Sequence, residues 1–179
     1  MSQSNINFAQ FYNELEKSLP NSTFAERRIW ASVIIETEFE LRELSRLLMA
    51  ERKIASRFAW LLSDIAIQSP EALFRELPFL FKLKDKITHI NFKTSFASYW
   101  LICGIPPENE GEAIDLLFHW LQSPKINVTT KSRALFSLFN LTQKYPELKN
   151  ELKICLEDQM DKNTKDFEKR AKKMLQKLA

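Results

Sequence analysis

Few residues in this chain of 179 residues are of types that could carry out chemistry. It has two histidines, His89 and His119, and two cysteines, Cys103 and Cys155, which stand 52 residues apart. Neither cysteine has a histidine at metal-site spacing, and no H-E-x-x-H sequence, serine elbow or glycine-rich phosphate loop occurs. We therefore expect two buried cysteines in a reducing compartment, no bound metal, no cofactor and no catalytic residue.

Acidic and aromatic side chains give weaker signals. Carboxylate pairs such as Glu108 and Glu112 could bind a cation, although a solvated acidic helix face is the more typical explanation. The four tryptophans, at positions 30, 60, 100 and 120, fall on apolar stripes and are expected to pack in the core. Tyr99 and Trp100 are adjacent, and neighbouring helical residues point in different directions, so this pair is a candidate contact for a partner.

The composition favours a folded helical domain. The chain is 45% hydrophobic, with 14 phenylalanines and only two glycines, and its net charge is +3. This apolar content excludes wholesale disorder, and the scarcity of glycine disfavours phosphate loops and nucleotide-binding sheets. The N-terminus lacks the basic and apolar regions of a signal peptide, and no apolar run is long enough for a membrane span. We expect a cytoplasmic protein that does not enter a membrane.

Apolar residues recur at helical spacing along almost the whole sequence. Pro-Glu pairs after positions 69, 106 and 145 are typical of first helical turns, and Thr23-x-x-Glu26 is a capping-box pattern. No linker divides the chain, so a single domain over 1–179 is predicted. The expected helices are 6–18, 22–35, 36–49, 51–68, 71–86, 88–103, 108–122, 128–144, 147–160 and 164–178.

An internal period runs through this pattern. Ala59, Ala97, Ala134 and Ala171 occupy similar positions in four helices and are separated by 38, 37 and 37 residues. A small residue at one site per unit is what close stacking of helical hairpins requires.

The repeat length and the segments around Phe58-Ala59-Trp60 and Phe167-Glu168-Lys169-Arg170-Ala171 resemble HEAT or armadillo-type repeats. The resemblance implies an all-α fold, a right-handed α-α superhelix of about five helical pairs. Residues 1–49 would form atypical capping helices and 50–179 the regular repeats. Pro78 is similar to the proline that kinks the first helix of many such repeats, and Asp161 and Asp85 match the acidic turn position.

Charge is divided between the two expected helix types. The first helices of the pairs (36–49, 71–86, 108–122 and 147–161) sum to −8, whereas the second helices (51–68, 88–103, 128–144 and 164–178) sum to +9. In repeats of this kind the second helices usually line the concave surface, so the resemblance implies a basic inner face. The candidate anion- or partner-binding residues are Arg57, Lys131, Arg133, Lys165, Lys169, Arg170, Lys172, Lys173, Tyr99 and Trp100, with Lys177 in the same cluster.

Simpler explanations remain open for these cations. Exposed lysines usually form a solvated face, and the arginines at positions 57, 133 and 170 could pair with acids of a neighbouring repeat instead of binding an anion.

The expected function is a non-enzymatic binding or scaffold protein whose basic face takes a protein partner. The alternative is nucleic-acid binding by the same face, since DNA alkylation repair glycosylases are built from similar repeats. In those enzymes an aromatic residue and a carboxylate serve the damaged nucleotide, and Trp60 and Asp64 lie on one expected helix here.

Overall fold

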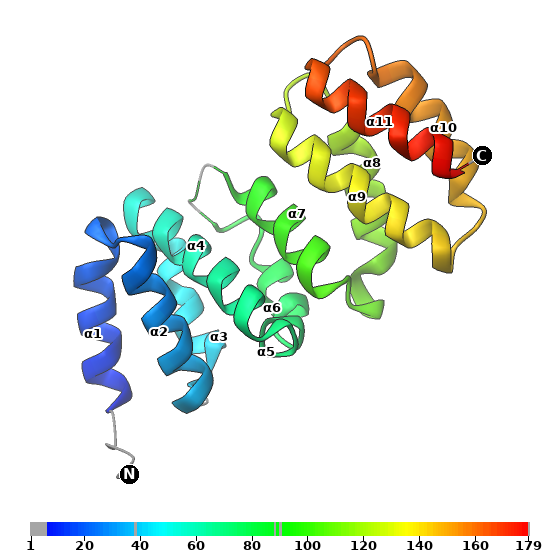
Figure 1. Ribbon diagram of the computed structural model, residues 1–179. Coiled ribbons are helices and arrows are strands. Elements are labelled where there is room, and N and C mark those ends of the chain that lie inside the picture. Colours follow the sequence, from blue (N-terminus) through cyan, green and yellow to red (C-terminus); the bar gives the residue numbers. More distant parts are fainter. Residues whose placement is uncertain (1–6, 38, 88, 90, 179) are drawn as a thin grey trace. The chain divides into compact units, whose positions relative to one another are not determined.

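The computed structural model describes residues 7–37, 39–87, 89 and 91–178. These residues form eleven α-helices and three 3-10 helices and contain no strand, which confirms the all-α class (Figure 1). Positions 1–6, 38, 88, 90 and 179 lie outside the described residues. Two expected helix starts, at residues 6 and 88, lie outside the described residues. So does most of the N-terminal segment that lacks signal-peptide features.

The chain divides into two compact units, Met1–Ser95 and Phe96–Ala179, called here the N-terminal unit and the C-terminal unit. The boundary falls within α7 (Phe92–Cys103). The single domain over 1–179 and its division into capping and regular repeats stay predictions.

The N-terminal unit holds the less regular helices. Its elements before α7 are α1 (Phe8–Ser18), η1 (Leu19–Asn21), α2 (Phe24–Thr37), α3 (Leu41–Leu44), η2 (Ser45–Met49), α4 (Arg52–Gln68), α5 (Pro70–Phe74) and α6 (Leu77–Lys82). The expected capping box forms at the start of α2, where the Thr23 amide donates to the Glu26 carboxylate and the Glu26 amide donates to Thr23 Oγ1. The expected helix 36–49 is instead a short α-helix followed by a 3-10 helix.

The expected helix 71–86 is broken by Pro78. Because proline has no amide hydrogen and clashes with the preceding turn, α5 ends at Phe74 and α6 restarts at Leu77, with Pro78 in its first turn. The prediction of one kinked helix is therefore wrong in detail, although it placed the disruption at the right proline.

The C-terminal unit has longer helices, and their bounds lie close to the expected ones. Its elements after α7 are η3 (Pro107–Asn109), α8 (Glu110–Gln122), α9 (Val128–Lys144), α10 (Leu148–Gln159) and α11 (Lys165–Leu178). Gly104 has φ 89° directly after α7, a conformation that favours glycine. The Asn127 side chain accepts a hydrogen bond from the Thr130 amide, and this cap explains why α9 begins at Val128.

The four periodic alanines are all buried at similar positions of their helices. Ala59, Ala97, Ala134 and Ala171 lie at the sixth to eighth positions of α4, α7, α9 and α11, and each is at most 1% exposed. A methyl side chain at these sites lets a neighbouring helix approach closely, which fits the role that the sequence assigned to them.

Hydrogen bonds also join residues about one period apart. Within the N-terminal unit they link Arg27 to Asp64, Ser32 to Gln68 and Arg42 to Glu76, at separations of 37, 36 and 34 residues. Within the C-terminal unit, Lys144 bonds to Glu110 over 34 residues. Such contacts are expected when each hairpin packs on the next, while the type of repeat and its superhelical winding stay predictions.

No helix in the described part of the chain combines the length and the apolar character needed to span a bilayer.

Candidate partner-binding surfaces

Arg57 lies within a group of rings and guanidinium groups on α4 and α2. Its Cζ is 4.6 Å from the centre of the Trp60 ring, one turn further along α4. Arg27 of α2 reaches the same ring, with its Cζ 5.4 Å from the centre. Arg27 also lies 5.9 Å from the centre of the Phe24 ring, and Arg28 lies 5.6 Å from that centre. We call Phe24, Arg27, Arg28, Arg57 and Trp60 the arginine–aromatic cluster.

A buried ion pair anchors this cluster. Arg27 Nε donates to Asp64 Oδ2 at 3.2 Å, and both side chains are over nine-tenths buried. Arg27 Nη1 also donates to the Ser22 carbonyl oxygen. Burial raises the pKa of Asp64, and the charge and hydrogen bond of Arg27 oppose this shift. Arg27 is therefore fixed in position, with the centres of both rings within 5.9 Å of its Cζ.

The expectation that Trp60 packs in the core is wrong. Trp60 is 42% exposed, while Phe58, Leu61, Leu62 and Ile65 of the same helix are fully buried. These buried residues define a face of α4 opposite Trp60. Because apolar residues occur on both faces of this helix, the sequence alone does not distinguish the exposed tryptophan from the buried residues. The arginines following Phe24 at the third and fourth positions were a usable signal, because that spacing places cations beside a ring.

A second cationic region lies on α11 of the C-terminal unit. The apolar residues Phe167, Ala171, Met174 and Leu178 are buried, and the cationic side chains lie on the exposed side of the helix. We call this set the C-terminal basic surface; its members are Lys165, Lys169, Arg170, Lys172, Lys173 and Lys177.

Two of these cations rest on rings of α9. Arg170 Cζ lies 6.0 Å from the centre of the Phe136 ring, and Lys177 Nζ lies 5.7 Å from the centre of the Phe139 ring. Lys172 Nζ donates to Glu168 Oε1 one turn back along α11. These contacts orient Arg170 and Lys177 and leave their charge uncompensated by any ion pair among the described residues.

Lys131 does not belong to an exposed surface, contrary to its place among the predicted binding residues. It is 3% exposed, and its Nζ donates to Gln159 Oε1 at 3.0 Å. Burial lowers the pKa of Lys131 because the charged form loses its hydration. Arg133, two residues on, is half-buried, and burial lowers its pKa as well.

Tyr99 and Trp100 are also buried, so the expectation that they offer an aromatic contact to a partner is not supported by their placement. They are 1% and 2% exposed, and the Trp100 ring stacks on Trp120 with centroids 5.7 Å apart. Helix α7 buries a wide arc that also includes Phe96 and Ala97. Two adjacent residues can both face the interior when a helix is covered on two sides.

Acidic side chains lie on α8 and α10 of the C-terminal unit. Glu110 of α8 is mostly buried and accepts hydrogen bonds from Lys144 Nζ at 2.7 Å and from the Tyr145 hydroxyl. Burial opposes ionisation of Glu110, but the two hydrogen bonds lower its pKa overall.

A surface groove of about 540 Å³ between α8 and α10 is lined by Glu147, Glu151 and Asp158 among others.

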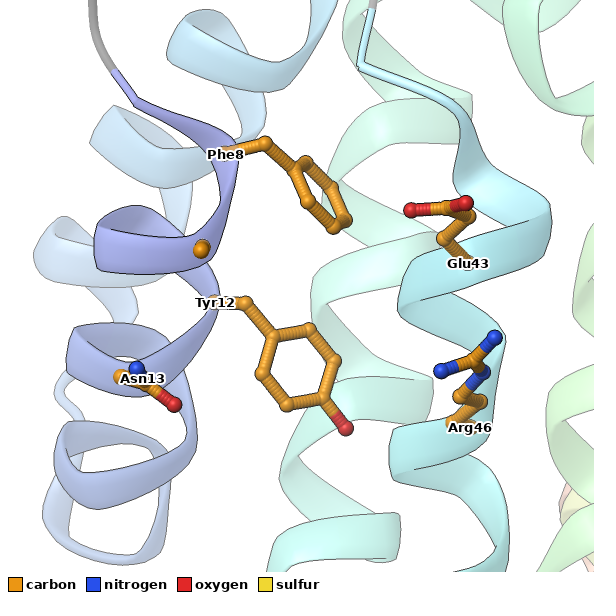
Figure 2. A pocket seen from close by; sticks show the side chains of 6 residues that line it. Phe8, Tyr12, Asn13, Glu43 and Arg46 are labelled. Carbon is orange, nitrogen blue, oxygen red and sulfur yellow. The ribbon is translucent and has the colours of Figure 1, made fainter.

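A smaller pocket of about 200 Å³ lies between α1 and the α3–η2 segment. Figure 2 shows the Phe8 and Tyr12 rings on one wall and Glu43 and Arg46 on the other. Burial and the charge of Glu16 raise the pKa of Tyr12, against the opposite effect of Arg46. The pocket is lined by one acid and one cation, so its charge selects neither anions nor cations.

His89 is buried between two hydroxyl groups, which the sequence did not indicate. Its Nδ1 is 3.0 Å from Ser56 Oγ, and its Nε2 is 3.1 Å from Ser95 Oγ. Burial lowers the pKa of His89. No carboxylate bonds to this imidazole among the described residues, so the arrangement lacks the third member of a hydrolytic triad.

Groups of histidine, cysteine and acidic residues that could hold a metal are absent from the described residues. Burial raises the pKa of Cys103 to about 11, which makes this thiol a poor nucleophile. Compared with protein-family models, curated proteins and solved structures, the chain shows no significant match to any of them.

Proposed function

We propose that this chain is a non-enzymatic binding protein built from HEAT-like helical repeats, and that its C-terminal basic surface binds an acidic protein partner. The observation that carries the proposal is the division of α11 into a largely buried apolar side and a polar side with six exposed cations and only two acids. Opposite charge on a partner would speed its encounter with this surface and select it against basic competitors.

The surface is well suited to binding without rearrangement. Its helix is held in place by Phe167, Ala171, Met174 and Leu178, and two of its cations are oriented by Phe136 and Phe139. Because this helix face is already formed, the protein loses little conformational entropy when a partner binds. A scaffolding role in the cytoplasm is part of this proposal.

Charge reversal tests the proposal. The double variant Lys169→Glu and Lys173→Glu changes the net charge by −4 on the C-terminal basic surface. Lys17→Glu with Lys125→Glu makes the same change at two exposed lysines outside it. Fluorescence anisotropy with labelled poly-L-glutamate at low salt should show binding by the wild type and the control, and at least about a ten-fold loss for the surface variant. Equal losses in both double variants would contradict the proposal.

Nucleic-acid binding is the alternative occupant of this surface, and the same assay distinguishes it. A labelled single-stranded oligonucleotide would bind with a steep salt dependence, log K falling by about 0.7 per phosphate contact for each tenfold rise in salt. Tight binding of the oligonucleotide without binding of poly-L-glutamate would replace the protein-partner proposal.

The position of Asp64 disfavours a glycosylase role. Asp64 is 6% exposed and its carboxylate is bonded to Arg27, whereas the role would require a carboxylate that faces a nucleotide.

A further inference from the structure

The arginine–aromatic cluster of the N-terminal unit has features of a binding site in its own right. Tryptophan and arginine are the residues most enriched where binding energy concentrates. Trp60 is 42% exposed and Phe24 is 59% exposed. They lie on α4 and α2, two helices that pack against each other and are joined by hydrogen bonds. Two aromatic side chains are thus kept partly in water at a site where Arg27 is fixed by a buried ion pair.

The contacts between guanidinium groups and rings form an unbroken series across α2 and α4. Arg28 lies over Phe24, Phe24 is next to Arg27, Arg27 lies over Trp60, and Trp60 is covered by Arg57. The rings restrict the guanidinium groups at the two ends, so Arg28 and Arg57 lose little freedom when they bind an anion. Between them lies the apolar surface of the two rings.

The cluster has a surplus of positive charge. Asp64 is the only acid that forms an ion pair with one of its three arginines among the described residues, and it neutralises Arg27. Arg28 and Arg57 therefore account for an excess of two positive charges. The complementary ligand carries two anionic groups, one for each end, and an apolar group between them.

We propose that this cluster binds an acidic peptide segment in which an apolar side chain lies between two acidic ones. Carboxylates would pair with Arg28 and Arg57, and the apolar side chain would pack on the exposed parts of Phe24 and Trp60. A nucleobase fits less well, because it needs an open ring face for stacking and each ring already has two guanidinium groups within 6.0 Å of its centre. This site shares no residue with the C-terminal basic surface.

The fluorescence of Trp60 reports on this site directly. Trp100 and Trp120 are buried and Trp30 is half-buried, so Trp60 is the tryptophan that a soluble quencher reaches most easily. The probe is the capped peptide Asp-Glu-Leu-Glu-Asp, titrated at low salt into the full chain. We expect it to protect a fraction of the fluorescence from acrylamide, and the peptide Asp-Glu-Gly-Glu-Asp to bind more weakly. The variant Trp60→Phe should abolish the protected fraction.

Single-charge variants test the arginines. Arg28→Gln and Arg57→Gln should each weaken the peptide by roughly five-fold, the upper end for an exposed ion pair. Arg52→Gln removes an exposed arginine from the same helix outside the cluster and should leave the affinity within about two-fold. Lys169→Glu with Lys173→Glu serves as the reference for the C-terminal basic surface and should also leave it unchanged.

The proposal is overturned by any of three results. These are an absence of Trp60 protection at low salt, an equal loss of affinity in the Arg52→Gln variant, or preference for a single-stranded oligonucleotide or a phosphotyrosine peptide over the acidic one. Trp60 fluorescence reports only on the arginine–aromatic cluster. Failure of the present proposal would therefore leave the poly-L-glutamate result at the C-terminal basic surface unaffected. Circular dichroism of each variant confirms that a lost signal does not come from unfolding.

Discussion

Arg27 and Asp64 form a buried ion pair 37 residues apart, a separation equal to two of the three spacings between the periodic alanines. The pair joins α2 to α4, and the same Arg27 guanidinium lies 5.4 Å from the centre of the Trp60 ring. One interaction therefore serves the packing of neighbouring helices and the geometry of an exposed aromatic surface.

Removing one partner of this pair should destabilise the protein strongly. Asp64→Ala leaves the Arg27 guanidinium buried without its counter-charge, which costs about 3–5 kcal/mol in the free energy of unfolding. Replacing both residues, as Arg27→Met with Asp64→Leu, should restore much of that loss. Urea unfolding measures both changes, with the exposed Asp115→Ala as the control. A loss below about 1 kcal/mol for Asp64→Ala would show that the ion pair is not buried as described.

Enlarging a periodic alanine should also destabilise the fold. Ala134→Leu inserts three carbon atoms at a site that is 0% exposed, and overpacking of this kind costs about 1–3 kcal/mol. The same change at Ala9, an exposed position of α1, should have an effect within about 0.5 kcal/mol. Thermal unfolding of the two variants compares them, and similar midpoints would contradict close helix packing at Ala134.

Much of this packing could be predicted from sequence. The periodic apolar stripe predicts helix α9 at its observed bounds, and the structure shows that the Asn127 side chain caps its start. The repeated spacing of the four alanines identifies them as packing positions. Lys131 and Trp60 could not be placed, since a helical stripe shows which residues share a face and not which neighbouring helix covers it. The burial of Lys131 depends on Gln159, which is 28 residues away.

Glu110 should make the C-terminal unit sensitive to acid. Its pKa is lowered in the folded protein, so the unfolded chain takes up the proton more readily as the pH falls. This contribution to stability is complete above the ordinary glutamate value of about 4.3 and is lost as the pH falls through the lower folded value. Glu110→Gln should show a shallower decline in unfolding free energy between about pH 5 and 3. An unchanged slope would mean that Lys144 and Tyr145 do not stabilise the carboxylate.

His89 should contribute acid sensitivity in a higher pH range. Burial lowers its pKa, so the unfolded chain binds the proton first once the pH falls below about 6.5. The unfolding free energy should therefore decline from there until the pH reaches the lower folded value. His89→Gln keeps a polar side chain between Ser56 and Ser95 but cannot titrate, so its curve should be flatter in this range. An NMR titration that gives His89 an ordinary pKa would refute the expectation.

The central claim is that the C-terminal basic surface is where an acidic partner binds. The most direct measurement is an amide chemical-shift titration of the labelled protein with poly-L-glutamate at low salt. The account predicts that the largest shifts fall on Lys165–Leu178 and on the part of α9 around Phe136 and Phe139. Shifts that are spread evenly over the chain, or that fall mainly on α8 and α10, would contradict it.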